Sequence, residues 1–196
     1  LPDGKIVVTP NGVDPAFGPD GPKADGSAYA LCVGALESRK DPVAAVEAVA
    51  LLPALRLVLA GPDRGGGAAV REAVGRLGLG DRVDLLGYVD QERLAALYRG
   101  AACLVFPSRY EGFGLPLVEA MACGAPVVAA RSGALPEVAG DAAVLVEPGS
   151  PAALARGIEE ALADRGRLVA AGLERARRFN WRTTAERTLA VYRELL

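Results

Sequence analysis

Residues 108–120, SRYEGFGLPLVEA, join a short apolar run to a segment with helical periodicity. Two glycines in this stretch, Gly112 and Gly114, allow the backbone to approach a ligand closely. Pro116 suits the first turn of a helix, where unpaired N–H groups and the positive end of the helix dipole attract anions. A strand, a glycine turn and a helix N-terminus in this order indicate an anion site that can hold a diphosphate without a side-chain cation.

Two carboxylates flank this glycine turn. Glu119 is expected about one turn into the helix, where a carboxylate can accept paired hydrogen bonds from a vicinal diol such as a ribose. Glu111 precedes the glycines and is expected to meet sugar hydroxyls at the other end of the diphosphate. Each Glu taken singly is more often a solvated charge, and a plain helix cap would also use flexible glycines. A cap does not explain both carboxylates, so we interpret the pair and the turn as one site.

Outward from this stretch, short β-branched runs alternate with longer Ala- and Leu-rich segments. This alternation is typical of βα units around a parallel sheet buried on both faces, so we predict an α/β fold with a doubly wound, Rossmann-like parallel sheet. The predicted strands lie near residues 5–9, 28–34, 56–60, 83–87, 102–106, 126–130 and 142–146. The predicted helices between them lie near residues 42–52, 67–78, 91–100 and 115–123.

The alternation ends at Ser150. Three helical patterns, at 151–163, 165–178 and 181–195, then follow one another without a strand, and Asn180 is expected to cap the last of them. Near the other end of the chain, residues 10–27 are rich in Pro, Gly and Asp and are predicted to form a loop or linker.

A second candidate for ligand binding follows the strand that ends at Gly34. Ligands of open α/β sheets bind beyond the carboxyl ends of the strands, which directs attention to the loops after residues 34, 61, 87 and 107. Arg39 and Lys40, in the first of these loops, are suited to neutralise a diphosphate. A solvated basic pair would leave the same trace in the sequence, so this alternative stays open here.

The loop after residue 87 has a weaker signal. Residues 87–89, GYV, are an ordinary turn signal. Their position alone suggests that backbone groups of Gly87, Tyr88 and Val89 hold a base.

Composition excludes several classes of function. The chain has 196 residues, of which 51% are hydrophobic and 23% charged, and its net charge is −2. This is globular composition without the positive field that nucleic acid or an anionic membrane requires, so we expect no nucleic-acid partner. The count of His is 0, which removes Ser-His-Asp catalysis, Cys-His catalysis and imidazole metal sites from this chain.

Cysteine usage and hydropathy indicate the compartment. Cys32, Cys103 and Cys123 are widely spaced and include no CxxC pair, so we expect buried thiols in a reducing, cytoplasmic setting and no metal site. Apolar runs stay well short of the roughly 18 residues that a membrane span requires. The chain starts LPDG, without Met, and is expected to be a piece of a longer protein.

Residues 108–140, SRYEGFGLPLVEAMACGAPVVAARSGALPEVAG, resemble the signature of glycosyltransferase family 4, the retaining nucleotide-sugar transferases of the GT-B fold. The family's E-x7-E pair corresponds to Glu111 and Glu119. The resemblance covers essentially the whole chain, through the stretches IVVTPNGVDPAF, GALESRKDP, GYVDQERLAALYRGA, AAVLVEPGSPAALARGI and FNW. It implies the donor-binding C-terminal lobe of a two-lobed enzyme, with an acceptor-binding N-terminal lobe outside this chain.

The resemblance also implies roles for individual residues. The first Glu of the pair, here Glu111, contacts the sugar, and the second, here Glu119, contacts the ribose. Lys40 matches the Lys of the family's phosphate-binding pair. The family's Arg often follows the Gly directly, where this chain has Ala35, so Arg39 is expected to substitute for it. The amides that meet sugar and phosphate become those of Gly112, Phe113, Gly114 and Leu115.

A domain division follows from the same resemblance. Residues 1–27 are expected to be a strand and linker from the missing lobe, 28–180 the nucleotide-sugar-binding domain, and 181–196 a helix that crosses back to the other lobe. The donor is expected to be a nucleoside diphosphate sugar, used without a metal or other cofactor. Relatives with a stretch like GALESRKD resemble mannosyl- and rhamnosyltransferases of surface-polysaccharide synthesis, so the sugar is expected to be mannose-like. The whole enzyme is also compatible with peripheral attachment to a membrane.

Two other readings remain from the residues alone. One is a nucleotide-sugar epimerase or phosphorylase of similar two-lobed architecture, and the other is a nucleotide-binding module without catalysis. The isolated chain is expected to bind a nucleoside diphosphate but not to transfer sugar, because the acceptor would lie on the other lobe.

Overall fold

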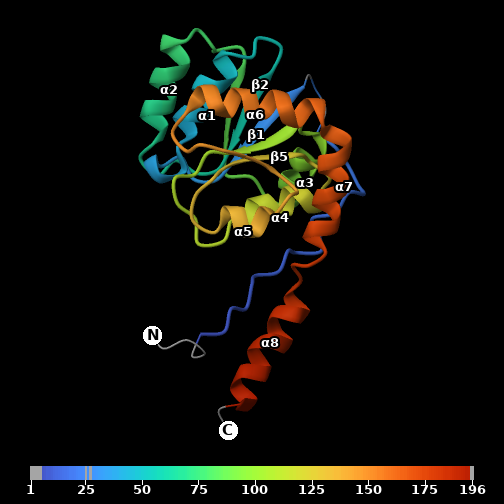
Figure 1. Ribbon diagram of the computed structural model, residues 1–196. Coiled ribbons are helices and arrows are strands. Elements are labelled where there is room, and N and C mark those ends of the chain that lie inside the picture. The colour runs from blue at the N-terminus through green and yellow to red at the C-terminus, as the bar shows by residue number, and fades with distance from the viewer. Residues whose placement is uncertain (1–5, 25, 27, 195–196) are drawn as a thin grey trace.

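A parallel sheet forms the centre of the computed structural model, which describes residues 6–24, 26 and 28–194 (Figure 1). Within this part of the chain the sheet has six strands in the order β3-β2-β1-β4-β5-β6. The strands are β1 (Tyr29–Val33), β2 (Arg56–Ala60), β3 (Val83–Gly87), β4 (Cys103–Phe106), β5 (Val127–Ala130) and β6 (Val144–Val146). The strand order reverses between β1 and β4, which makes this the doubly wound topology that the alternation predicts.

Helices cover both faces of the sheet, so the inner strands β1, β2, β4 and β5 bury both of their sides, whereas the edge strand β3 is partly exposed (Figure 1). In β4, Cys103 and Val105 pack into one core cluster, whereas Leu104 and Phe106 pack into the other, as the two-residue period of a strand requires. One face is covered by α1 (Pro42–Ala50), α2 (Gly67–Arg76) and α6 (Pro151–Ala163). The other is covered by α3 (Gln91–Gly100), α4 (Leu115–Ala122), α5 (Leu135–Ala139) and α7 (Arg165–Ala176).

Two predicted elements need correction. The strand expected at 5–9 is wrong for residues 6–9, and position 5 lies outside the described residues. Ile6, Val7 and Val8 are exposed, because a β-branched run forms a strand only where another strand offers it hydrogen bonds. Helix α5, in contrast, lies in a stretch for which the pattern predicts no helix, since five residues are too few to show a helical period.

The last helix, α8 (Trp181–Glu194), projects away from the rest of the molecule (Figure 1). None of its described residues is buried, and Trp181, Leu189 and Tyr192 are exposed. Asn180 caps it as predicted, since its side-chain oxygen accepts a hydrogen bond from the Thr183 N–H at 2.8 Å. The helix is therefore held at its first turn and does not pack on the sheet domain.

Removal of residues 185–196 is expected to change the free energy of unfolding by less than about 0.5 kcal/mol, because this part of α8 buries no side chain among the described residues. Urea unfolding of the truncated and the complete chain would measure this. A matched truncation after residue 164, which removes α7 and its contacts with α4, should prevent cooperative unfolding. A large loss in the 185–196 truncation would show that α8 packs on this domain or on a second copy in solution.

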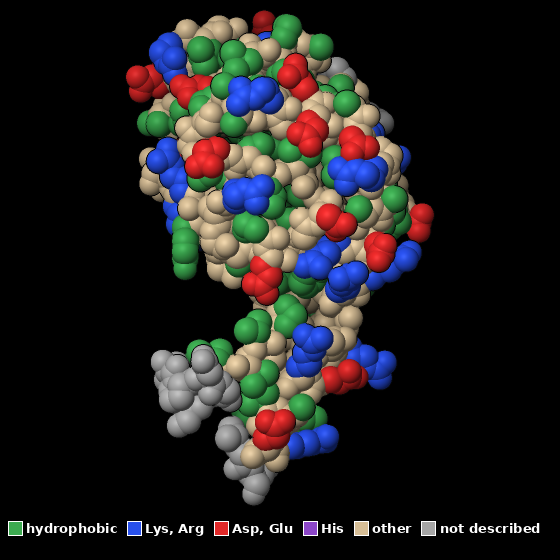
Figure 2. Space-filling model, in the orientation of Figure 1, with side chains coloured by type: hydrophobic (Ala, Val, Ile, Leu, Met, Phe, Trp, Pro, Cys, Tyr) green, Lys and Arg blue, Asp and Glu red, His purple; other side chains and the backbone are tan. Residues whose placement is uncertain are grey.

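Surface charge and thiols agree with the composition. Lys and Arg side chains are intermixed with Asp and Glu over the face that Figure 2 shows. All three cysteines are buried free thiols, as predicted, and burial raises the pKa of Cys32 and of Cys103 to about 12. No helix in the described ranges is both long enough and apolar enough to cross a bilayer.

Candidate functional site

Three glycines bring the loops after β1, β2 and β3 together at the carboxyl edge of the sheet. The Gly61 N–H donates to the carbonyl of Gly87 at 2.8 Å, and the Gly34 N–H donates to the carbonyl of Ala60 at 2.9 Å. A Cβ atom on Gly61 would lie 2.0 Å from the Gly34 carbonyl oxygen. The loops after β1, β2 and β3 are therefore packed backbone against backbone, which only a glycine at position 61 permits.

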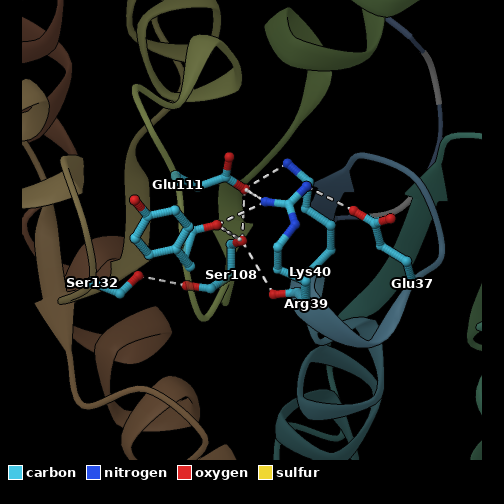
Figure 3. Close-up of polar contacts among 7 residues, drawn as sticks. Glu37, Arg39, Lys40, Ser108, Glu111 and Ser132 are labelled. Carbon is cyan, nitrogen blue, oxygen red and sulfur yellow. Dashed lines mark hydrogen bonds and ion pairs between the residues drawn. The ribbon is translucent and has the colours of Figure 1, made fainter.

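Lys40 and Glu111 form the centre of the site (Figure 3). Lys40 Nζ lies 2.5 Å from Glu111 Oε1, and the Arg39 guanidinium lies 3.4 Å from the same oxygen. Lys40 belongs to the short 3₁₀ turn η1 (Ser38–Lys40) after β1, whereas Glu111 belongs to the loop after β4. The structure thus brings together the three residues that the sequence separates into two candidate loops.

Buried polar contacts fix the position of Glu111. The hydroxyl of Ser108, which is 0% exposed, donates to Glu111 Oε1 at 2.6 Å. The Glu111 carbonyl accepts from the Ala134 N–H at 3.0 Å, and a Cβ atom on Gly133 would come within 2.4 Å of that carbonyl oxygen. Ser132 adds a bond of 2.6 Å from its hydroxyl to the Ser108 carbonyl (Figure 3). The loop between β5 and α5 therefore acts as a rigid support for Glu111.

A second set of contacts fixes the cations. The Arg109 N–H donates to the Arg39 carbonyl at 2.9 Å, and the Arg109 side chain pairs with Asp41 at 2.9 Å. Asp41 has a φ of +51°, in the left-handed region, which Asp tolerates better than most residues. This conformation reverses the chain between η1 and α1 and keeps Lys40 directed toward Glu111. Such strain at a ligand-binding turn is typical of functional sites.

The N-terminus of α4 has the features of an anion site. Gly114 precedes the helix with a φ of +96°, and no side chain caps the first turn. Gly112 has open space where a Cβ atom would lie, so no protein atom requires a glycine there. The ring of Phe113 packs edge-on against Phe179 with centroids 5.5 Å apart, which anchors the loop. Leu115 begins the helix, Pro116 has no N–H, and the Leu117 N–H donates to the Gly114 carbonyl at 3.0 Å. Among the described residues, the backbone donors at this end of α4 are therefore those of Leu115 and of the loop before it.

Glu119 lies on α4 but outside the Lys40–Glu111 cluster. Its Oε2 accepts a hydrogen bond of 2.9 Å from the hydroxyl of Tyr98 on α3. Burial raises the pKa of Glu119, and the bond from Tyr98 opposes this by lowering it. The structure therefore separates the two carboxylates, with one held by cations and the other by a phenol.

The predicted base-binding loop contacts neither carboxylate in the described structure. Gly87 has a φ of +66° and joins the edge of the sheet through its bond with Gly61. Tyr88 is 80% exposed, whereas Val89 packs against the core beside α3 and α4. Through Gly61, this loop is brought to the same edge of the sheet as Gly34.

Sequence reasoning missed four residues that shape the site. Three of them carry no separate signal: Tyr98 has the helical spacing of a core residue, and Asp41 and Ser132 read as turn residues. Ser108 could have been found, because it is a polar residue next to a wholly apolar run, where burial without a partner would be costly.

Comparison with known proteins agrees with this geometry. The strand order and the helices on both faces define a Rossmann-like class of α/β domain. Residues 16–182 match the family model described as glycosyl transferases group 1, so the chain belongs to this family.

Named relatives are consistent with the family. The chain is 37% identical over 175 residues to the O-antigen chain mannosyltransferase B of Escherichia coli, which covers 85% of this chain and 46% of that protein. The sucrose-phosphate synthase structure from Thermosynechococcus elongatus is similar with a TM-score of 0.85 and 36% identity, over 95% of this chain and 52% of that one. A structure of HepE from Anabaena with UDP-glucose shares the fold, with a TM-score of 0.76 and 24% identity over 85% of this chain and 49% of that one. The chain thus spans about half the length of the proteins it matches.

Proposed function

We propose that this chain is the donor-binding lobe of a retaining glycosyltransferase, which transfers a sugar from a nucleoside diphosphate sugar to an acceptor on a second lobe. The observation that carries the proposal is the convergence of Lys40 and Arg39 on one oxygen atom, Oε1 of Glu111, at the carboxyl edge of the sheet. The family membership supports it, and so does the UDP-glucose bound to the Anabaena protein of the same fold.

Each group then has a role in the transfer. Lys40, Arg39 and the backbone N–H groups of residues 112–115 stabilise the negative charge that grows on the leaving diphosphate, and the proposal includes no metal ion. The side-chain contacts described for Glu111 all use Oε1, which leaves Oε2 for a sugar hydroxyl. Glu119 binds the ribose, and Gly87, Tyr88 and Val89 hold the base. Retention of the anomeric configuration follows from the family and not from the two carboxylates, which contact different parts of the donor.

The sugar and the pathway are the finer part of the proposal. The stretch GALESRKD and the name of the E. coli relative support a mannose-like donor and a role in polysaccharide or glycolipid synthesis. The acceptor is expected on the lobe outside this chain, so the chain alone binds the donor without transferring its sugar.

A thermal-shift panel of UDP, GDP, ADP and dTDP, each with its matching nucleoside, tests the proposal. A ligand that binds only the folded state stabilises it by RT ln(1 + [L]/Kd), about 2.7 kcal/mol at 100 times Kd. At least one diphosphate should raise the melting temperature, and its nucleoside should raise it less. A panel in which no diphosphate has an effect at millimolar concentration would contradict donor binding, and sugar transfer by the chain alone would contradict the missing acceptor lobe.

Replacement of Glu119 with Ala should weaken binding of a ribonucleoside diphosphate by roughly tenfold, the effect of one hydrogen bond to a charged group. The 2′-deoxy counterpart should lose less, because it lacks one of the two hydroxyls. Calorimetric titration of both ligands measures the difference, and Glu72→Ala, an exposed carboxylate on α2, is the charge-matched control. Equal losses for the two ligands would show that Glu119 does not contact the ribose.

A further inference from the structure

The buried phenol of Tyr98 has an unusual partner. Tyr98 is 0% exposed, and its hydroxyl donates to Oε2 of Glu119 at 2.9 Å, from α3 to α4. Its ring packs edge-on against Phe17 with centroids 5.8 Å apart, so the ring is fixed in the core. Tyr29, another buried tyrosine, donates instead to a backbone carbonyl, that of Leu97. The hydroxyl of Tyr98 is therefore bonded to the half-buried carboxylate of Glu119 and not to the backbone.

The environment of this pair keeps the phenol a donor. Burial raises the pKa of Tyr98 well above its ordinary value, and the negative charge of Glu119 raises it further. The thiols of Cys32 and Cys123 lie close enough to act in the same direction. The phenol therefore stays protonated and can only donate to the carboxylate.

The pKa of Glu119 is subject to opposing effects. Burial raises its pKa, the charge of Asp14 raises it further, and the hydrogen bond from Tyr98 lowers it. Burial raises the pKa of the neighbouring Cys123 thiol, the charge of Arg99 lowers it, and the charge of Glu119 raises it. Of these groups, the Tyr98 hydroxyl forms the direct hydrogen bond that favours ionised Glu119.

We infer that Tyr98 is a positioning residue for ribose selectivity: it holds Oε2 of Glu119 so that the remaining acceptor sites of the carboxylate face the ribose diol. An ionised carboxylate has about four acceptor sites, so one bond from Tyr98 leaves enough for two hydroxyls. Because the rotamer is already fixed, less side-chain entropy is lost when the ribose binds. The inference rests on the proposed function, since it requires that Glu119 contacts the ribose.

The Tyr98→Phe variant tests this, because it removes one oxygen and keeps the ring in its place. The probes are the ribonucleoside diphosphate that stabilises the wild type most and its 2′-deoxy counterpart, both titrated by calorimetry. The ratio of the two affinities should fall by about fivefold, as expected for the indirect loss of one charge-assisted hydrogen bond. The affinity for the 2′-deoxy ligand should fall less, because that ligand retains only one of the two hydroxyls that Glu119 binds.

The pH profile separates positioning from packing. Without the phenol, the pKa of Glu119 rises, so the ribose preference of Tyr98→Phe should be weakest at acidic pH and should recover as the pH is raised. In the Glu119→Ala background, Tyr98→Phe should have no further effect on the ratio. Tyr29→Phe is the matched control, since it removes a buried hydroxyl that bonds to the same helix but not to Glu119.

The outcomes are distinguishable. A Tyr98→Phe variant with the wild-type ratio, or with equal losses for both ligands, would overturn the inference and assign Tyr98 to the core alone. A wild type that binds diphosphates without preferring the ribose would overturn it as well, while leaving donor binding intact. A wild type that binds no nucleoside diphosphate would overturn the proposed function and this inference with it.

Discussion

Replacing Gly61 with Ala is expected to lower the free energy of unfolding by roughly 3 kcal/mol, through backbone strain and steric overlap. Gly61 has a φ of +154°, which side chains rarely adopt, and the added Cβ would lie 2.0 Å from the Gly34 carbonyl oxygen. The neighbour that must move is backbone, so no side-chain rotation can relieve the contact. The same movement would displace Gly34 from the Gly87 loop, so binding of a nucleoside diphosphate should also weaken.

Urea denaturation of the variant measures the effect, and Gly75→Ala is the matched control. Gly75 lies in α2 with open space around its missing Cβ, so the same substitution should stabilise the protein by about 0.5–1 kcal/mol. Opposite signs for the two variants would confirm the steric argument. Unchanged stability in Gly61→Ala would mean that the loops after β1 and β2 are not packed as tightly as the structure shows.

Replacing Lys40 with Ala is expected to weaken binding of a nucleoside diphosphate by roughly 100-fold. The substitution removes a cation that is only 18% exposed and leaves Glu111, whose side chain is 11% exposed, without its closest counter-charge. That uncompensated carboxylate would then repel the diphosphate. The nucleoside alone should lose much less affinity, because neither effect acts on a neutral ligand.

A second substitution separates the loss of the Lys40 cation from the repulsion by the uncompensated Glu111 carboxylate. Adding Glu111→Gln to Lys40→Ala should restore part of the diphosphate affinity, because the repelling charge is gone. Arg76→Ala, which removes an exposed cation at the end of α2 that pairs with Glu47 of α1, is the charge-matched control and should have little effect. The loss in Arg39→Ala should shrink more with added salt than the loss in Lys40→Ala, since Arg39 is 46% exposed and exposed charges are screened over about 8 Å. Equal losses for nucleoside and diphosphate would show that the two cations are only a solvated patch.

The order of the strands and of the longer helices could be predicted from the sequence. The alternation of β-branched runs with Ala- and Leu-rich segments predicts all six strands of the described sheet and all of the longer helices. The strands can be predicted because a strand buried on both faces needs a continuous apolar run. The glycine turn before α4 also depends on local sequence alone, since Gly114 permits a positive φ and Pro116 favours the first turn of a helix. The strand predicted at 6–9 is not formed, because a strand also needs a neighbouring strand to bond with, and local sequence does not show whether one is present.

Only the tertiary structure decided which residues meet. Lys40 and Glu111 are 71 positions apart, and it is the adjacency of β1 and β4 in the sheet that sets their atoms 2.5 Å from each other. The bond from Ser132 to the Ser108 carbonyl spans 24 positions, and the bond from Tyr98 to Glu119 spans 21. Backbone propensity acts within a few residues, so the sequence by itself determined the strands, the longer helices and the glycine turn before α4. Contacts between distant side chains arise from packing of the whole sheet, which therefore decided how the two carboxylates are held and separated.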